Sequence, residues 1–351
     1  MSGVPVKVTA TAYGAGKPVP GERLLTVTDL VRHFEVGGRF LRRTTVVHAV
    51  NGVTFHVDAG ETFSLVGESG CGKSTVGRTV MGFHPPTSGT VDFEGRDVGA
   101  MSRRELRAMR RRIQYVFQDP YASLPARLPV GQILSEPLEI HKIGDAASRR
   151  ARVRELLELV GLRKELASRY PHEFSGGQRQ RIGIARALAL EPRMLVLDEP
   201  VSALDVSVQA QVVNLLDRLQ AELGLGYVFI AHDLDVVRHI SDRIAVMYLG
   251  TIVEAGPATT IFTAPQHPYT QALLSAVPVK DPRQRGRGQR RLLSGDLPSP
   301  TAIPPGCPFA TRCPKVHDLC RTELPPLLPS ESGALSACHL TRTGKPAAAA
   351  S

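Results

Sequence analysis

The chain has 351 residues, of which 42% are hydrophobic, and a formal net charge of +10. The length suggests two or three domains, and the apolar fraction is enough for ordinary globular cores. No apolar run approaches the ~20 residues that span a bilayer, and Met1 to Pro20 lack the apolar region of a signal peptide. We therefore expect a cytosolic chain. Its positive charge suits nucleic acid or an anionic membrane surface, and it equally suits general solubility.

The first segments predict a tail and two strands. Residues 1–23 carry Gly, Pro, Thr and Ala without apolar periodicity, which predicts a flexible tail. Leu24–Val36 and Val46–Val57 alternate apolar and polar residues, as strands with one exposed face do. Between them, Gly37–Arg43 holds two glycines and three arginines and indicates a loop. Phe34, near the end of the first strand, is either a core residue or a ring that stacks on a base.

The clearest chemical signal is the stretch GESGCGKST at residues 67–75, which fits the pattern G-x-x-x-x-G-K-[ST]. It lies between a predicted buried strand, Thr62–Val66, and a predicted helix, Thr75–Met81, which is the context that the motif requires. Its glycines let backbone N–H groups point inward around anionic oxygens, and the helix adds its positive end. Lys73 can reach the β- and γ-phosphates, and the Ser74 hydroxyl can ligate Mg²⁺. The residues expected to bind ATP are Phe34, Gly67, Ser69, Gly70, Cys71, Gly72, Lys73, Ser74 and Thr75.

The segments after this loop alternate between strands and helices. Strands are predicted at Thr90–Phe93, Ile113–Phe117, Met194–Leu197 and Tyr227–Ile230, with a hairpin formed by Ile244–Tyr248 and Thr251–Glu254. Helices are predicted at Ser102–Arg112, which holds six arginines, and at Val208–Leu223. From about residue 119 to 185, apolar side chains recur at helical spacing, as at Val153, Leu156 and Val160. The pattern implies a parallel, doubly wound sheet into which a helical subdomain is inserted.

Four polar residues follow predicted strands closely: Gln118, Asp198, Glu199 and His232. In a phosphate-loop ATPase, an Asp at the position of Asp198 holds Mg²⁺, and Glu199 beside it can act as general base on the attacking water. Gln118 can reach the metal and the γ-phosphate, and His232 can hydrogen-bond the γ-phosphate. Each is weak evidence alone, but open α/β sheets bind ligands at the carboxyl ends of their strands. We expect Ser74, Gln118 and Asp198 to hold Mg²⁺, and Glu199, His232 and Gln118 to be catalytic.

A second glycine motif lies on the helical insertion. It reads FSGGQRQ over residues 174–180 and can begin a helix, but it is apparently remote from Lys73. The economical interpretation is that the motif binds the γ-phosphate held by another subunit. Two chains would then sandwich two nucleotides head to tail, with Ser175, Gly176, Gly177 and Gln178 completing the partner's site.

The last hundred residues change in composition. Beyond Ala264 the chain becomes rich in Pro and Arg, with five arginines between residues 283 and 291, and this indicates a linker or mobile segment. Cys307, Cys313, Cys320 and Cys338 follow, with the spacing C-x5-C-x6-C-x17-C. Zinc sites more usually show close C-x2-4-C pairs. Four thiolates without a close pair are compatible with an iron–sulfur cluster, while zinc and free thiols in a mobile tail stay open as alternatives.

Taken together, these motifs resemble the ATPase subunit of an ABC transporter. The phosphate loop, Gln118, the FSGGQ signature, LVLDEP at 195–200, SALD at 202–205 and His232 follow the family's order over about 170 residues. The resemblance implies an α/β phosphate-loop ATPase with an antiparallel β subdomain, an inserted helical subdomain and a small Cys-containing C-terminal extension. Its expected divisions are a tail (1–23), the ATPase domain (24–265, insertion about 119–185), the extension (266–340) and a tail (341–351). Asp205 would lie at the dimer interface and communicate between the two sites.

Finer features resemble the oligopeptide/dipeptide importer subfamily. These are FQDPYASL at 117–124, PVSALDVS at 200–207, HPYTQALL at 267–274 and the cysteine segment. One departure is PAR at 125–127, where the subfamily usually has Asn-Pro-Arg; that segment faces the membrane subunits in relatives. The resemblance implies a [4Fe–4S] cluster on the four cysteines.

The resemblance also predicts function and partners. We expect an ATPase that energises import of di- or oligopeptides from the cytoplasmic face of the cell membrane. Its partners would be a second, similar ATPase, two permease subunits and, indirectly, an extracytoplasmic peptide-binding protein, with no nucleic acid. An importer of nickel or another small solute is the alternative within the subfamily. A soluble ATPase acting on nucleic acid is a third possibility, which the +10 charge suggests.

Overall fold

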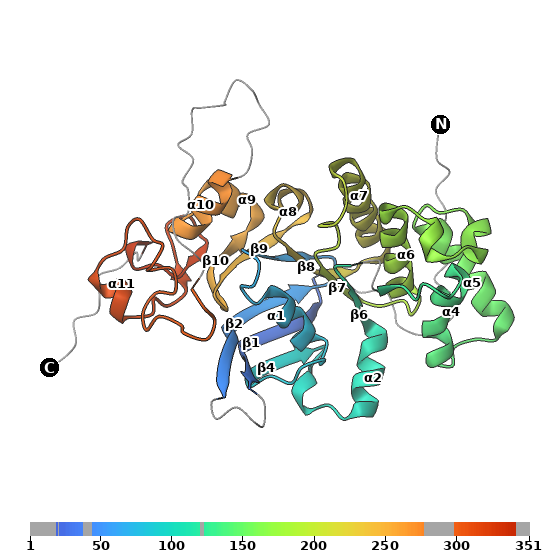
Figure 1. Cartoon of the computed structure of the whole chain (residues 1–351), viewed down its shortest axis with the longest axis horizontal. Helices are drawn as coiled ribbons and strands as arrows, with labels where there is room; N and C mark the ends of the chain where they lie inside the picture. The colour runs from blue at the N-terminus through green and yellow to red at the C-terminus, as the bar shows by residue number, and fades with distance from the viewer. Residues whose placement is uncertain (1–18, 20, 38–43, 120–122, 277–297, 342–351) are drawn as a thin grey trace, which may run out of the picture.

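A computed structural model describes residues 19, 21–37, 44–119, 123–276 and 298–341 (Figure 1). The expectations for the N-terminal tail up to residue 18, for the loop at 38–43, for the arginine run at 283–291 and for the last ten residues lie outside this part of the chain. Among the helices of the described part, none is both long and apolar enough to cross a membrane.

The centre of the molecule is an eight-stranded sheet in the order β11-β12-β10-β9-β3-β8-β7-β6. Its strands are β3 (Thr62–Val66), β6 (Ile113–Val116), β7 (Met194–Asp198), β8 (Gly226–Ala231), β9 (Arg243–Tyr248), β10 (Thr251–Pro257), β11 (Leu328–Pro329) and β12 (Leu335–Ser336). The five strands from β6 to β9 in this order are parallel, and β10 to β12 continue the sheet in antiparallel fashion. The predicted parallel sheet is therefore confirmed, as is the hairpin at Gly250.

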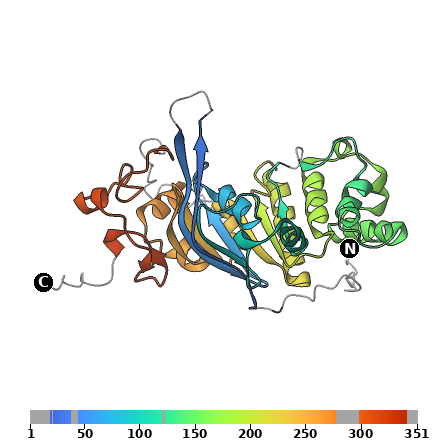
Figure 2. The same ribbon diagram turned by 90° about the horizontal axis from the view of Figure 1, so that it is seen from below.

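A second, antiparallel sheet has the order β2-β1-β4-β5. Its strands are β1 (Arg23–Val36), β2 (Thr45–Asp58), β4 (Ser88–Phe93) and β5 (Arg96–Asp97). Figure 2 shows β1 and β2 as a long hairpin that projects beyond the rest of the fold. This is the antiparallel β subdomain that the sequence predicts.

Helix α1 (Lys73–Val80) packs between the two sheets. A side chain at Gly77 would place its Cβ 2.9 Å from Ile230 Cδ1 and 3.1 Å from Val196 Cγ1, so this glycine allows α1 to approach the central sheet closely. The strand residues divide by period two: Met194 and Val196 enter the core on this side, whereas Leu195 and Leu197 enter the core on the other. Strand β7 is thus buried on both faces, as its continuous apolar sequence requires.

The second face of the sheet is covered by helices α6 (Gly176–Leu188), α7 (Val206–Leu223), α8 (Leu234–Ile240), α9 (Ala258–Thr263) and α10 (Pro268–Ala276). The prediction of a linker beyond Ala264 is wrong for residues 268–276, which form α10 and bury Tyr269 completely. Local composition favoured a linker because Pro265 and Pro268 interrupt the sequence, yet proline at a helix's first turn costs nothing.

The helical subdomain combines α4 (Val130–Ile140), α5 (Ala146–Leu159) and α6, with short 3-10 turns at Lys164–Ser168 and Pro171–Glu173. Asp145 caps α5 by accepting a hydrogen bond from the N–H of Ser148 at 2.8 Å. The arginine-rich segment forms the exposed helix α2 (Arg103–Arg112), capped by Ser102 and Glu105.

The C-terminal extension comprises α11 (Asp318–Thr322), β11, β12 and a final 3-10 turn, His339–Thr341. It lies at the opposite end of the long axis from the helical subdomain (Figure 1). Its cysteine segment has no large core of its own. Instead Cys307, Phe309, Cys320 and Ala334 join the main hydrophobic core, so the extension is packed onto the ATPase domain rather than suspended from it.

Candidate nucleotide-binding site

One cavity of about 660 Å³ gathers most of the predicted ATP-binding and catalytic residues. It opens at the carboxyl ends of β3, β6, β7 and β8, beside the end of the β1–β2 hairpin. Its lining residues are Phe34, Val47, Ala49, Ser69, Gly70, Gly72, Lys73, Ser74, Thr75, Gln118, Glu199, His232 and Pro300. Residues as far apart in the chain as Phe34 and Pro300 therefore meet at the sheet edge where the sequence predicted a ligand site.

The phosphate loop can form only with glycine at two of its positions. Gly67 and Gly72 have φ of 152° and 106°, where residues with a side chain are strained. A Cβ on Gly67 would lie 2.2 Å from the carbonyl oxygen of Met247, and one on Gly72 would lie 2.1 Å from that of Ala49. The loop is thus fitted closely against β2 and β9.

Lys73 is the cation of this site and is almost fully buried. Its Nζ donates to the carbonyl oxygens of Gly67 at 2.8 Å and Glu68 at 2.9 Å, so the side chain folds back over the loop. The Cys71 side chain is buried in the core beneath, and burial raises the pKa of its thiol. Of the expected ATP-binding residues, Gly67 and Cys71 do not line the cavity among the described residues that border it.

The predicted metal side is assembled around Asp198, which is 2% exposed at the end of β7. Its Oδ1 accepts a hydrogen bond from Ser74 Oγ at 2.8 Å, and its Oδ2 accepts one from Tyr115 Oη at 2.6 Å. Burial and the neighbouring carboxylate raise the pKa of Tyr115, which keeps its hydroxyl a donor. Ser74 and Asp198 thus meet as two oxygen ligands of the kind Mg²⁺ prefers. Sequence reasoning missed Tyr115, because a tyrosine within an apolar strand gives no separate signal.

Glu199 is held in an unusual backbone conformation, with φ of 47°. Its N–H donates to the carbonyl of Ile230 at 2.9 Å. Glu199 Oε2 accepts from Gln118 Nε2 at 2.7 Å and lies 3.2 Å from His232 Nδ1. The carboxylate is 12% exposed and the imidazole 53%. Two of the predicted catalytic side chains, Gln118 and His232, therefore meet one carboxylate oxygen of the third, Glu199. Strained backbone at such a place is typical of functional sites.

Pro300 borders the same cavity from the C-terminal extension. Its carbonyl oxygen accepts a hydrogen bond from the N–H of His48 in β2 at 2.9 Å. Together with Phe34 and Val47 it makes an apolar wall that suits the base of a nucleotide. No motif around Pro300 pointed to this role, because only tertiary packing brings it to β2.

The signature motif begins helix α6. Ser175 Oγ accepts from the N–H of Gln178 at 3.3 Å, and Gln178 Oε1 accepts from the N–H of Ser175 at 3.0 Å, which forms a capping box. A Cβ on Gly177 would lie 2.2 Å from Val208 Cγ1, so this glycine lets α6 pack against the start of α7. Among the described residues that border the ATP cavity, none comes from this motif. Asp205 is exposed and precedes the first residue of α7.

The four cysteines lie in the extension as free thiols, Cys307, Cys320 and Cys338 buried and Cys313 half-buried. The Cys307 N–H donates to the Cys320 carbonyl at 2.8 Å. Burial, followed by the fields of the other three cysteines, raises the pKa of Cys307 to about 11. Four cysteines are the donor set that an iron–sulfur cluster takes, although the raised pKa of Cys307 disfavours the thiolate that binds iron. Their arrangement does not fit a cluster, because no group of three or more His, Cys, Asp or Glu side chains in the described part is placed to hold a metal.

A phosphate loop, a buried Asp–Ser pair and a carboxylate held by Gln and His define a phosphate-loop protein built to bind and hydrolyse a nucleotide. The family model described as "ABC transporter" matches residues 50–202 of this chain. A second, "Oligopeptide/dipeptide transporter, C-terminal region", matches residues 253–320.

Relatives match over nearly the whole chain. The putative oligopeptide transport ATP-binding protein YkfD of Bacillus subtilis (strain 168) is 54% identical over 92% of this chain and 97% of its own length. The oligopeptide transport ATP-binding protein AppF of the same organism is 50% identical, covering 91% of this chain and 98% of its own length. The probable peptide ABC transporter ATP-binding protein y4tS of Sinorhizobium fredii is 52% identical over 94% of this chain and 92% of its own length.

Solved structures agree. A dimeric ATP-binding cassette, MJ0796, in a post-hydrolysis state with ADP and phosphate bound, is 29% identical with a TM-score of 0.60, over 67% of this chain and 99% of its own. CbiO1 of Clostridium perfringens, part of an ABC transporter complex, is 30% identical with a TM-score of 0.61, over 69% of this chain and 92% of its own. The chain belongs to the ATP-binding proteins of ABC transporters, in the branch that carries the oligopeptide/dipeptide transporter C-terminal region.

Proposed function

We propose that this chain hydrolyses MgATP to energise the import of peptides, working with membrane permease subunits at the cytoplasmic face of the membrane. The observation that carries the hydrolytic part is the convergence of Gln118, Glu199 and His232 beside Lys73 and Ser74 in one cavity. The relatives' names, all of which speak of peptide or oligopeptide transport, support peptides as the cargo.

Each residue of the cavity has a proposed role. Lys73, which now donates to loop carbonyls, would contact the β- and γ-phosphates when ATP binds, and Ser74, Asp198 and Gln118 would supply the oxygen ligands of Mg²⁺. Glu199 takes a proton from the attacking water while His232, on the same carboxylate oxygen, orients the γ-phosphate. Phe34 and Pro300 border the adenine end.

The working unit is proposed to be a head-to-tail dimer with a similar ATPase. The capped and exposed N-terminus of α6 offers Ser175, Gly176 and the N–H groups of the first turn to an anion. Because this helix start does not border the chain's own cavity, its phosphate would come from the partner. Asp205, exposed just ahead of α7, would lie at that interface.

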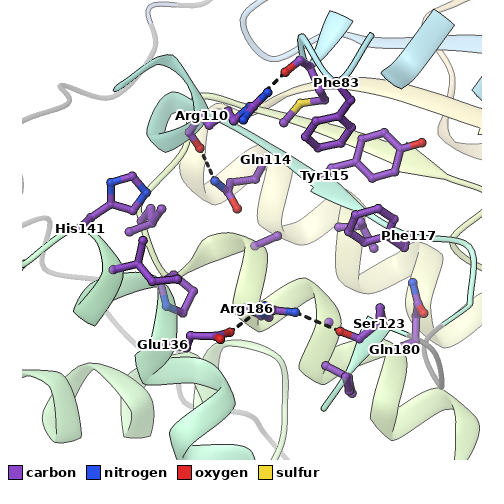
Figure 3. Close-up of a pocket in the computed structure, with 18 residues that line it drawn as sticks. Phe83, Arg110, Gln114, Tyr115, Phe117, Ser123, Glu136, His141, Gln180 and Arg186 are labelled. Carbon is purple, nitrogen blue, oxygen red and sulfur yellow. Dashed lines mark hydrogen bonds and ion pairs between the residues drawn. The ribbon is translucent and has the colours of Figure 1, made fainter. Parts of the chain in front are cut away.

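The permease is proposed to dock in a second cavity of about 250 Å³ between β6 and the helical subdomain. Figure 3 shows the rings of Phe83, Tyr115 and Phe117 on one side and Arg186, bound to Glu136, on the other. Phe117 and Ile140, which both line this cavity, are 44% and 50% exposed, and Phe117 directly precedes Gln118. A short permease segment seated here would touch the residue next to the ATP site.

The docking surface can be tested by co-purification. Ile140→Glu should reduce recovery of the ATPase with its permease subunits and leave ATP affinity unchanged. Leu340→Glu, at an equally exposed apolar residue on the extension, is the matched control. Normal recovery of the Ile140 variant would contradict this docking site.

Cys307, Cys313, Cys320 and Cys338 are proposed as ligands of a [4Fe–4S] cluster with a structural role. Their four thiols are the donors that such a cluster takes, and the resemblance of the cysteine segment to the oligopeptide/dipeptide importer subfamily supports the proposal, although the side chains would have to move together to bind it. Anaerobic purification followed by iron and sulfide analysis tests this. A colourless protein with one tightly bound zinc, or with four alkylatable thiols, would refute it.

The proposed function as a whole is tested on the assembled transporter. The expected result is co-purification with integral membrane subunits and ATP hydrolysis that rises when peptide-loaded binding protein is added. If a nickel-loaded binding protein stimulated ATP hydrolysis and a peptide-loaded one did not, the proposed cargo would change from peptide to nickel. Sedimentation with nucleic acid and never with membranes would overturn the importer assignment.

A further inference from the structure

The phosphate loop is joined to the C-terminal extension through the side chain of Glu68. The carboxylate accepts two hydrogen bonds from the Arg312 guanidinium, Nη1 to Oε2 at 2.7 Å and Nη2 to Oε1 at 3.1 Å. Two parallel contacts of this kind are the strongest geometry that an arginine and a carboxylate can adopt. Arg312 is 7% exposed and Glu68 is 26% exposed, so the pair is partly shielded from water.

Glu68 is also held by its backbone. Its N–H donates to Tyr269 Oη at 3.0 Å, so this amide is directed at α10 and not at the cavity. Its carbonyl oxygen accepts from Lys73 Nζ at 2.9 Å. If Lys73 turns to the phosphates of ATP, this last bond is given up. The outward anchors on Arg312 and Tyr269 then hold the first half of the loop in place.

The surroundings of Arg312 are rigid. Tyr248, Tyr269 and Phe309 are completely buried and touch one another, with ring centroids 4.7 to 5.4 Å apart. The Arg312 guanidinium lies 5.9 Å from the Tyr248 ring centroid. Because Phe309 and Arg312 come from the extension and Tyr248 from β9, the extension cannot shift without disturbing packed aromatic rings.

We propose that Arg312 is a positioning residue for ATP hydrolysis: through Glu68, and together with Tyr269, it fixes the phosphate loop in its phosphate-binding shape. The C-terminal extension is therefore part of the support of the nucleotide site. Arg312 does not touch nucleotide itself. Its role rests on the proposed ATPase function, since it acts through the loop that holds the β- and γ-phosphates.

The test compares Arg312→Met with Arg321→Met, which removes an exposed arginine of the same extension. In full-length protein, Arg312→Met should weaken ATP and ADP binding about tenfold, as loss of a charged hydrogen-bonded pair does, and leave AMP binding unchanged. Arg312→Lys should recover part of the affinity. Tyr269→Phe, which keeps the buried ring, should weaken ATP binding by a smaller factor.

A double-variant cycle adds a readout that general destabilisation would not produce. Glu68→Gln combined with Arg312→Met should cost no more ATP affinity than the larger single effect, because both remove one contact. Additive losses would overturn the proposal. So would wild-type ATP affinity in Arg312→Met, or an equal loss for AMP with a lower melting temperature.

These binding measurements do not depend on turnover. If the wild-type chain bound ATP but hydrolysed none in the assembled transporter, the proposed function would fail. The binding measurements would still test whether Arg312 positions the phosphate loop through Glu68. In an active enzyme, Arg312→Met should raise KM for ATP by a larger factor than it lowers kcat. A lowered kcat with unchanged KM would contradict positioning through the phosphate loop.

Discussion

Replacing Glu199 with glutamine removes the proposed general base with little change in shape. The amide has the same size, and its oxygen can still accept the hydrogen bond that Gln118 Nε2 gives at 2.7 Å. The backbone strain at φ of 47° is the same for Gln as for Glu. The carboxylate is only 12% exposed, so bulk water cannot readily replace it as proton acceptor. ATP binding should therefore survive while proton transfer is lost.

The expected loss of turnover is ~10²–10⁴-fold, the usual contribution of one general base. This corresponds to about 3–5 kcal/mol in the activation free energy. The assay is steady-state ATP hydrolysis by the assembled transporter, with ATP affinity measured on the same preparation. Sedimentation in the presence of MgATP should show a stable dimer, because ATP sandwiched between the subunits is no longer removed.

A turnover rate within a few-fold of wild type would refute the role of Glu199. Loss of ATP affinity in parallel with rate would also refute it, since the carboxylate is assigned to the water and not to the nucleotide. His232→Ala should lower the turnover rate by a smaller factor than Glu199→Gln, because His232 contacts the same carboxylate oxygen but is half exposed.

Three further predictions follow from other residues. Lys73→Ala should weaken ATP binding itself, because it removes the only cation lining the described cavity, and a binding titration that matches Glu199→Gln would contradict this. Ser175→Arg should block hydrolysis at the partner's site yet leave this chain's own ATP affinity intact, as measured on the isolated subunit. Burial lowers the pKa of His267 to about 3 from its ordinary 6.5, so the folded state binds fewer protons than the unfolded state. Stability should be fully present above pH 6.5 and fall by up to about 1.4 kcal/mol per pH unit below it. Denaturant titrations of His267→Asn should show a flatter dependence between pH 6.5 and 5, where the raised pKa of neighbouring Glu254 acts with the opposite sign.

The sequence predicted that these side chains would meet at one edge of the sheet, because strand ends place them there. Gln118, Asp198, Glu199 and His232 each follow an apolar run closely, and parallel strands bring their carboxyl ends to one edge. The spacing of residues within one motif is fixed by local geometry. The sequence alone was therefore sufficient to predict where these side chains and the loop that precedes α1 lie.

The residues that sequence reasoning missed reach the site by tertiary packing. Tyr115 is hidden in an apolar strand, and Pro300 and Arg312 come from a segment more than two hundred positions after the phosphate loop. Nothing in the local pattern around them specifies which distant surface they meet. Helix α10 was not predicted for the same reason, because its formation depends on the burial of Tyr269 against Tyr248 and Phe309.

The ion pair between Glu68 and Arg312 joins positions 244 residues apart, and this separation has a consequence for biosynthesis. A ribosome makes the phosphate loop, the signature and the catalytic edge long before it reaches Arg312. Every ATP motif is therefore translated while Glu68 still lacks its guanidinium partner, and the aromatic packing that holds Arg312 waits for Phe309. A nascent or prematurely terminated chain has the residues of an ATPase without the anchor of its phosphate loop. Under the proposed role of Arg312, the phosphate loop gains its full support only after residue 312 has been translated and has packed against Glu68.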